Sequence, residues 1–254
     1  SPITQKSVND CENAKGEPKK VTLREARKEG YIPSVTTILG MLPKPGLEKW
    51  KLTQVAEAAW SVVDFELRPD LLDASDRANF LETTLKVAQE NMTKARELGT
   101  DIHGRIDKWL QEGMPTPPCA YTEAARTALD SIVGHGYPYR VETTFAVKCD
   151  DAWVAGKCDL HYFGLKQLFD WKSSKEPCDG VKPMGYDEHV IQIASYQMAL
   201  FGELREGSAN IFLSTSIPGN FQIVPWTLEE LGRGWQMYRF LFKLWCLQKN
   251  YNPS

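Results

Sequence analysis

Apolar residues recur at helical spacing through the first half of the chain, and the pattern changes to strand-like runs after residue 137. The helical pattern covers 47–60, 80–89, 95–110 and 121–134. Strands are predicted at 140–149, 153–163, 167–173, 209–215 and 221–225, with a helix at 190–200 between the third and the fourth. The Thr227-x-x-Glu230 pattern is typical of a capping box that opens a terminal helix.

The order of these elements predicts an α/β protein, in which a central mixed β-sheet is flanked by helices and preceded by a helical N-terminal region. A proline-rich break at 114–118 separates the helical part from the strands. The 254 residues, 42% of them hydrophobic, are enough for one large core. We therefore predict one domain over 31–254, mainly helical over 31–136 and built from the sheet and the last helix over 137–254. The polar, lysine-rich residues 1–30 are predicted to be flexible or loosely docked.

Three charged residues stand inside two consecutive predicted strands. Asp159 ends a Gly156-x-x-Asp159 pattern, and Asp170-x-Lys172 follows in the next strand. Because side chains alternate along a strand, Asp170 and Lys172 share one face while Trp171 faces a packed layer. Two carboxylates suit Mg²⁺, which prefers oxygen ligands, and a neighbouring ammonium suits hydrolysis of a phosphodiester.

Each of these short patterns is weak by itself, since each is expected about once by chance in a chain of this length. A solvent-facing strand with an ion pair of little energetic value would account for Asp170 and Lys172 equally well. The neighbouring residues Leu168, Phe169 and Trp171 favour the functional interpretation, because an apolar strand makes an unpaired charge costly.

Two predicted helices carry polar residues that complete a larger pattern. Gln192 and Tyr196 lie one turn apart on the helix at 190–200, and His103 lies beside the apolar stripe of the helix at 95–110. Taken singly, each of these residues is typical of ordinary helix packing.

These residues follow one another along the chain in a fixed order: His103, Gly156-x-x-Asp159, Asp170-x-Lys172 and Gln192-x-x-x-Tyr196. The ordered series resembles the RecB-type branch of the PD-(D/E)XK nuclease superfamily. The resemblance spans about 99–200, and residues 31–39 with Trp50 are also similar to the amino-terminal segment of phage and mitochondrial exonucleases of this branch. It implies a restriction-endonuclease-like core and makes 31–254 a single nuclease domain, with the catalytic sheet and the C-terminal helix over 137–254.

The same resemblance implies a role for each matched residue. His103, Asp159, Asp170 and the backbone carbonyl of Trp171 would bind Mg²⁺ or Mn²⁺, and Lys172 would be the catalytic lysine. Gln192 and Tyr196 would support the site or contact the DNA strand. Glu142 is a further metal-binding candidate, because its strand is expected to pair with the strand of Asp159. A polar residue on an exposed strand face is an equal alternative for Glu142.

The cysteines do not follow the four-cysteine arrangement that holds an iron–sulfur cluster in several RecB-type nucleases. They are scattered along the chain without a Cys-x-x-Cys pair, at Cys11, Cys119, Cys149, Cys158, Cys178 and Cys246. We therefore expect no iron–sulfur cluster and no zinc site. With no apolar signal segment at the start and no long apolar run, the sequence favours reduced thiols in a cytoplasmic protein, in the bacterial host if a phage encodes the chain.

The charge balance argues against a protein that coats DNA, because the net charge is -3 and the pI is about 5.9. An enzyme needs only a local basic track, for which Arg105 and Lys175 are the best candidates. The hydroxyls of Ser34 and Thr36 are candidates for phosphate binding, with turn and cap roles as the alternative. The long connection over 174–189 is predicted to be an ordered functional loop or a lid.

The sequence thus predicts a metal-dependent DNA exonuclease that acts on single strands or duplex ends in recombination, replication or repair. A recombination or single-strand-binding protein would be a further partner. A structure-specific or restriction-type endonuclease has the same residues and stays open. A nuclease-fold module that binds DNA without cutting is disfavoured, because such a module has no need to keep costly charges together.

Overall fold

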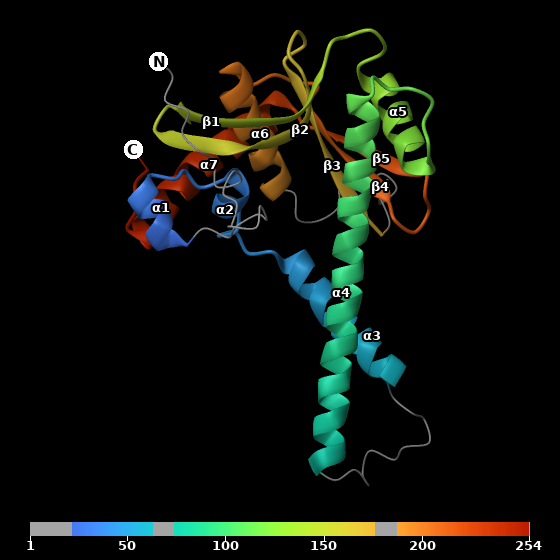
Figure 1. Ribbon diagram of the computed structural model, residues 1–254. Coiled ribbons are helices and arrows are strands. Elements are labelled where there is room, and N and C mark those ends of the chain that lie inside the picture. The colour runs from blue at the N-terminus through green and yellow to red at the C-terminus, as the bar shows by residue number, and fades with distance from the viewer. Residues whose placement is uncertain (1–21, 63–73, 176–186, 254) are drawn as a thin grey trace. The chain divides into compact units, whose positions relative to one another are not determined.

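The computed structural model describes residues 22–62, 74–175 and 187–253 (Figure 1). The elements are α1 (Leu23–Glu29), α2 (Val35–Leu39), α3 (Pro45–Val62), α4 (Ala74–Gln111), α5 (Ala120–Ile132), β1 (Arg140–Cys149), β2 (Ala152–Tyr162), β3 (Gln167–Ser174), α6 (Asp187–Phe201), β4 (Ala209–Ser214), β5 (Phe221–Pro225) and α7 (Leu228–Lys249). The fold is therefore α/β, as predicted, with a helical region before a five-stranded mixed sheet.

The sheet has the strand order β1-β2-β3-β4-β5. β1, β2 and β3 form an antiparallel meander, β4 runs parallel to β3, and β5 returns antiparallel to β4. The parallel step needs a crossover connection, because two parallel strands cannot be joined by a tight turn. Helix α6 lies in this connection, so residues of α6 face the first three strands.

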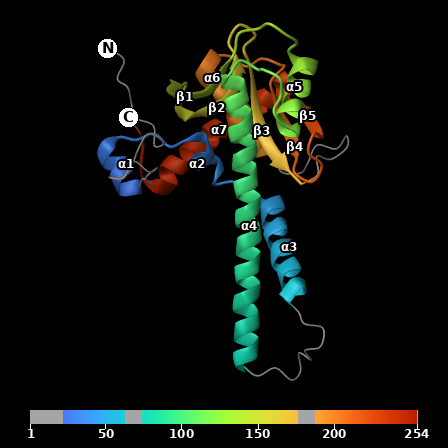
Figure 2. The ribbon, with the colours of Figure 1, turned by 45° about the vertical axis from the view of Figure 1, so that its right-hand side comes forward.

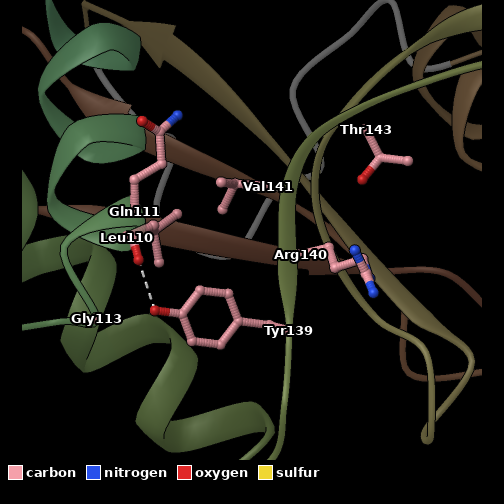
Figure 3. Close-up of a pocket in the computed structure, with 7 residues that line it drawn as sticks. All are labelled: Leu110, Gln111, Gly113, Tyr139, Arg140, Val141 and Thr143. Carbon is pink, nitrogen blue, oxygen red and sulfur yellow. Dashed lines mark hydrogen bonds between the residues drawn. The ribbon is translucent and has the colours of Figure 1, made fainter.

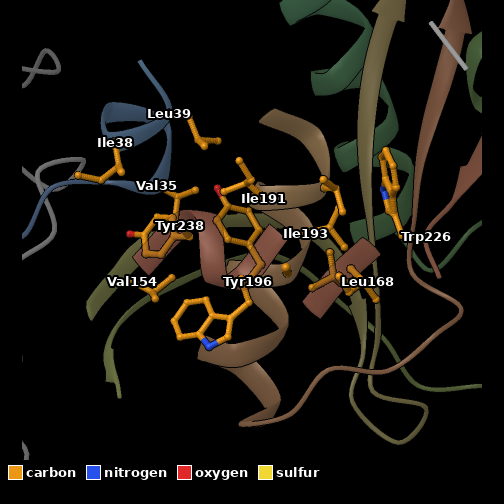
Figure 4. Packing of buried hydrophobic residues seen from close by; sticks show 14 of the residues in the cluster. Val35, Ile38, Leu39, Val154, Leu168, Ile191, Ile193, Tyr196, Trp226 and Tyr238 are labelled. Carbon is orange, nitrogen blue, oxygen red and sulfur yellow. The ribbon is translucent and has the colours of Figure 1, made fainter. Parts of the chain in front are cut away.

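Helices α6 and α2 pack together over the sheet, and α7 packs against both of them. The core between these layers contains Val35, Leu168, Ile191, Tyr196 and Tyr238, all of them buried (Figure 4). Helix α5 lies beside β4 and β5 instead, as the turned view in Figure 2 shows. The middle of α6 is buried from Val190 to Gln197, because the helix is covered by both the sheet and α7.

The chain divides into two compact units. One is residues 44–104, which holds α3 and most of α4, and the other holds the sheet, α1, α2, α5, α6, α7 and the last two turns of α4. The two helices predicted at 80–89 and 95–110 are parts of the single helix α4. The single domain expected over 31–254 stays a prediction.

Part of the N-terminal segment forms a helix. Residues 23–29, within the segment predicted to be flexible or loosely docked, form α1, while residues 1–21 lie outside the described part of the chain. A capping box between Thr22 and Glu25 begins the helix. The hydroxyl of Tyr251 donates hydrogen bonds to the carbonyls of Ala26 (3.0 Å) and Tyr31 (2.8 Å), so α1 is tied to the end of the chain. Among the described helices, none has the length and apolar character needed to cross a membrane.

Candidate active site

The candidate site forms where β2 and β3 separate. Their ladder consists of three pairs and ends at Leu160–Phe169, so Asp159 and Asp170 are the next residues on the two strands. Beyond this point the Asp159 carboxylate replaces the missing strand partner, because its Oδ2 accepts a hydrogen bond from the backbone N–H of Trp171 at 2.9 Å. The N–H and C=O groups of one strand residue point to the same side. The carbonyl of Trp171 is therefore directed to the side of Asp159.

The strand alternation places Asp170 and Lys172 together, as predicted. The Nζ of Lys172 lies 2.6 Å from Oδ2 of Asp170, whose side chain is only 5% exposed. Trp171, between them, is fully buried on the opposite side of the strand. An ion pair in this setting differs from a surface ion pair, because its carboxylate has been removed from water.

Helix α6 supplies the next two residues of the site. Oε1 of Gln192 accepts a hydrogen bond from Nζ of Lys172 at 3.2 Å, and Nε2 of Gln192 donates to the hydroxyl of Tyr196 at 3.3 Å. The structure thus joins four of the residues that the sequence singled out into one chain of contacts, Asp170 to Lys172 to Gln192 to Tyr196.

Gly156 has a steric reason to be glycine. A Cβ at this position would lie 2.9 Å from the hydroxyl oxygen of Tyr196 and 3.0 Å from its Cε1 atom. The aromatic ring of Tyr196 therefore rests directly on the backbone of β2, where it also meets the edge of Phe145 at a centroid distance of 5.0 Å. The spacing Gly156-x-x-Asp159 reflects close helix–strand packing beside the site.

The electrostatics of the site are those of two carboxylates that share one ammonium group. Burial, and then the nearby Asp170 carboxylate, raise the pKa of Asp159 to about 7. Burial alone would lower the pKa of Lys172, but Asp170 and Asp159 more than offset it, and the pKa of Lys172 is raised. With Lys172 charged and both carboxylates ionised, the cluster carries one uncompensated negative charge, which favours binding of a proton or a cation.

Two residues of the site were not found from the sequence. Asn210 on β4 is fully buried and donates from Nδ2 to Oδ2 of Asp170 at 2.8 Å. Asp107 on α4 acts electrostatically on Asp159, and its buried Oδ1 has no hydrogen-bond partner among the residues that the structure describes. The signal for Asn210 was present, since it is a polar residue at the second position of the strand and is followed by three apolar residues. No pattern distinguished Asp107 from other acidic helix residues.

Glu142 lies on β1, between the ladder pairs Val141–Leu160 and Thr143–Cys158, and thus opposite Asp159. Its strand pairs with β2 as expected. Its backbone is in the left-handed region, with φ of 50°, which is unusual for a residue other than glycine. The side chain forms an ion pair with Lys157. Both interpretations of Glu142, metal ligand and polar edge residue, are compatible with this position.

The other predicted site residues are less closely tied to the carboxylates. His103 belongs to the unit formed by 44–104, so its placement beside the carboxylates stays a prediction. Arg105 is exposed on α4, and Lys175 is exposed just after β3. The loop predicted over 174–189 falls largely on 176–186, which lie outside the described residues.

Ser34 has the cap role that was the predicted alternative to phosphate binding. Its Oγ accepts the N–H of Thr37 at 3.2 Å at the start of α2 and lies 2.9 Å from Oγ1 of Thr36. Its backbone also forms an isolated parallel bridge with Ala155 on β2. These contacts fix α2 beside the strand that carries Asp159.

A pocket of about 460 Å³ lies between the start of β1 and the end of α4 (Figure 3). Its lining residues Val141 and Thr143 pair with Leu160 and Cys158, so the pocket lies along the part of β1 that pairs with β2 on either side of Asp159. Tyr139 stands at its edge and donates its hydroxyl to the carbonyl of Leu110 at 2.6 Å. Of the described residues that line the pocket, Arg140 alone is charged.

The donor set fits a hard divalent cation. Asp159, Asp170 and the carbonyl of Trp171 are all oxygen donors, and magnesium sites in proteins commonly use only one or two carboxylates. Over the described ranges, no group of three or more His, Cys, Asp or Glu side chains is gathered as a metal cage. These oxygen donors are of the type that magnesium and manganese prefer.

Comparison with known proteins adds no assignment. No protein-family model matches the chain, and a search of curated protein sequences finds no match.

Proposed function

We propose that the chain is a metal-dependent deoxyribonuclease that hydrolyses phosphodiester bonds, and that it acts as an exonuclease on single-stranded DNA or duplex ends. The observation that carries this proposal is the meeting of Asp159, Asp170 and Lys172 where β2 and β3 separate. A buried carboxylate pair with one ammonium is costly for stability. A catalytic role accounts for that cost.

The topology supports the proposal independently of the side chains. An antiparallel meander, a crossover helix and a parallel fourth strand place both aspartates at one point and bring the crossover helix over them. This arrangement agrees with the restriction-endonuclease-like core that the sequence resemblance implies. The resemblance also supplies the choice of exonuclease, which the site residues alone do not make.

Asp159, Asp170 and the carbonyl of Trp171 would hold Mg²⁺ or Mn²⁺, with His103 and Glu142 as further candidates. When bound, the cation would supply a lowered pKa for its water and would offset negative charge on the scissile phosphate. Water then adds to phosphorus while one P–O ester bond breaks, which yields one hydroxyl end and one phosphate end.

Lys172 is placed to act on this reaction directly. Its ammonium is held between Oδ2 of Asp170 and Oε1 of Gln192, so that within the described ranges two of its three N–H donors are used. A remaining donor would orient the attacking water or stabilise charge on the phosphate oxygens. Gln192, itself bonded to Tyr196, keeps the ammonium in place.

Free thiols support a cytoplasmic location. The four cysteines in the described ranges, Cys119, Cys149, Cys158 and Cys246, are all unpaired, and thiols stay reduced in the cytoplasm.

DNA is the proposed partner, together with a recombination or single-strand-binding protein. Arg105 and Lys175 are the basic residues proposed to lie along the path of the DNA.

Digestion of end-labelled linear DNA and of circular DNA, each single- and double-stranded, tests the proposal. The full chain should degrade linear DNA with Mg²⁺ or Mn²⁺, leave circles intact and stop with a chelator. Asp170→Asn should be inactive. Asp151→Asn is the matched control, because Asp151 pairs with Arg239 at the β1–β2 turn, away from the site.

The alternatives predict different results. Cutting of circular DNA would favour the endonuclease. DNA binding without cutting under any metal condition would favour the binding module, and cutting that resists chelation would refute the metal mechanism. Full activity of Asp170→Asn would refute the site itself.

A further inference from the structure

Asn210 is the residue on β4 in register with Asp170, and both of its polar atoms are used. Its side chain is completely buried, and Trp226, which follows β5, is 3% exposed. The indole Nε1 of Trp226 donates to Oδ1 of Asn210 at 2.8 Å, and Nδ2 of Asn210 donates to Oδ2 of Asp170 at 2.8 Å. Three side chains on three neighbouring segments thus form one continuous chain of hydrogen bonds.

The chemistry of Trp226 determines which way the amide faces. An indole N–H is a donor and never an acceptor, so Trp226 can bond only to the oxygen of the Asn210 amide. The amide nitrogen must then face Asp170. Asp170 receives the N–H donor of Asn210 only as long as Trp226 keeps the Asn210 amide from rotating.

Oδ2 of Asp170 therefore receives two donors, Nδ2 of Asn210 and Nζ of Lys172 at 2.6 Å. Within the described part of the chain, the hydrogen bonds found for Asp170 all involve Oδ2. Two donors from different elements fix both the position and the rotation of the carboxylate group. This leaves Oδ1 as the oxygen through which Asp170 can bind another group.

We propose that Trp226 and Asn210 are positioning residues that orient Asp170, so that its Oδ1 binds the divalent cation. The inference rests on the proposed function. Trp226 and Asn210 touch neither substrate nor metal, and they act through Asp170 alone.

Stability does not explain this polar pair. Replacing both partners of a buried hydrogen bond with apolar groups of similar shape is close to neutral, whereas removing one partner leaves the other unsatisfied. Hydrogen-bonded groups behind a metal ligand typically change metal affinity by about 10- to 100-fold when they are lost. The two explanations therefore predict different outcomes for a double substitution.

The test is Mn²⁺ binding to the full chain, measured by electron paramagnetic resonance of free Mn²⁺, together with urea unfolding. Asn210→Leu should weaken Mn²⁺ binding about 10- to 100-fold and lower stability, because Trp226 loses its acceptor. The double variant Asn210→Leu with Trp226→Phe should regain stability but not Mn²⁺ affinity. Trp226→Phe alone should weaken binding by a smaller factor, since the amide is released but retained.

Trp235→Phe is the matched control. It also removes an indole hydrogen bond to a carboxylate, from Nε1 of Trp235 to Oδ2 of Asp150 at 3.3 Å, but at the β1–β2 turn. Its Mn²⁺ affinity should equal that of the parent chain.

Wild-type Mn²⁺ affinity in the double variant would overturn the positioning role and leave a structural role only. An unchanged Mn²⁺ affinity of Trp226→Phe would show that Trp226 has no positioning role. A parent chain that binds no Mn²⁺ would instead refute the metal site of the proposed function, and the inference with it, so the two failures are distinguishable.

Discussion

Replacing Lys172 with methionine tests whether the ion pair in the site is structural, catalytic or both. The change keeps the length of the side chain and removes its charge. It leaves the Asp170 carboxylate, 5% exposed, with the amide of Asn210 as its remaining hydrogen-bond donor. The consequences for stability and for activity can be estimated separately.

The stability cost follows from the geometry of the pair. At the separation of 2.6 Å, the Coulomb energy is about 6 kcal/mol for an effective dielectric constant of 20. Part of this energy only offsets the desolvation of the two charges. Breaking a buried pair by removing one partner costs about 3–5 kcal/mol. We expect the lower end, about 3 kcal/mol, because the side chain of Lys172 is 26% exposed and Asn210 still donates.

The assay is urea unfolding of the chain in chelator and in Mg²⁺, combined with digestion of end-labelled linear DNA. In chelator, Lys172→Met should be about 3 kcal/mol less stable than the parent. Mg²⁺ should recover part of this loss, because a cation bound by Asp170 replaces the missing charge. Activity should not recover, because the cation does not replace the ammonium that acts on water or phosphate.

Lys166→Met is the control for removing one lysine from an ion pair. Lys166 pairs with Glu203, and both side chains are more than a third exposed, so the expected loss is less than about 1 kcal/mol with full activity. Lys172→Met with parental stability in chelator would refute the buried-pair argument. Lys172→Met with parental activity would refute the catalytic assignment.

Three further predictions concern the same site. Gly156→Ala should cost about 1–3 kcal/mol of stability and reduce activity, because its Cβ would displace the ring of Tyr196; Gly232→Ala, with open space at its Cβ, should lose neither. Because the pKa of Asp159 is raised to about 7, the metal-free protein favours its protonated form, and stability should fall as the pH rises from about 4 to about 7. Mn²⁺ binding should then release close to one proton from Asp159 near pH 6 and almost none near pH 8.5. Calorimetry in buffers of different ionisation enthalpy measures this release. Equal release at both pH values would contradict the raised pKa of Asp159. Glu142→Gln should leave Mn²⁺ affinity within about threefold, since its carboxylate is already held in an ion pair, and a larger loss of affinity would make Glu142 a metal ligand.

Local pattern was sufficient for the elements that carry the site. The predicted strand at 140–149 has the observed bounds. The predicted strand at 153–163 is shifted by one residue from the observed β2, and the predicted strand at 167–173 ends one residue before the observed β3. The face shared by Asp170 and Lys172 followed from the same alternation, because the side-chain period of a strand is a property of the backbone. The position of Gln192 and Tyr196 on one face of a helix, one helical turn apart, followed from helical spacing in the same way.

Contacts between segments distant in sequence were not readable from local pattern. Asn210 reaches Asp170 only because β4 pairs in parallel with β3 after the crossover through α6. The separation of β2 and β3, where Asp159 accepts the N–H of Trp171, depends on where a ladder ends. Asp107 gave no signal, because its influence on Asp159 arises from the packing of α4 and not from its neighbours along the chain.

The sequence by itself therefore determined the α/β class, the strands and the residue types of the site, because these depend on periodicities of two and 3.6 residues and on side-chain chemistry. Only the tertiary structure decided how the charges are shared. It buries Asp170, places Lys172 between Asp170 and Gln192, and makes Asn210 the second donor to the same carboxylate oxygen. These relations depend on strand order and register, which long-range packing sets and a local pattern does not contain.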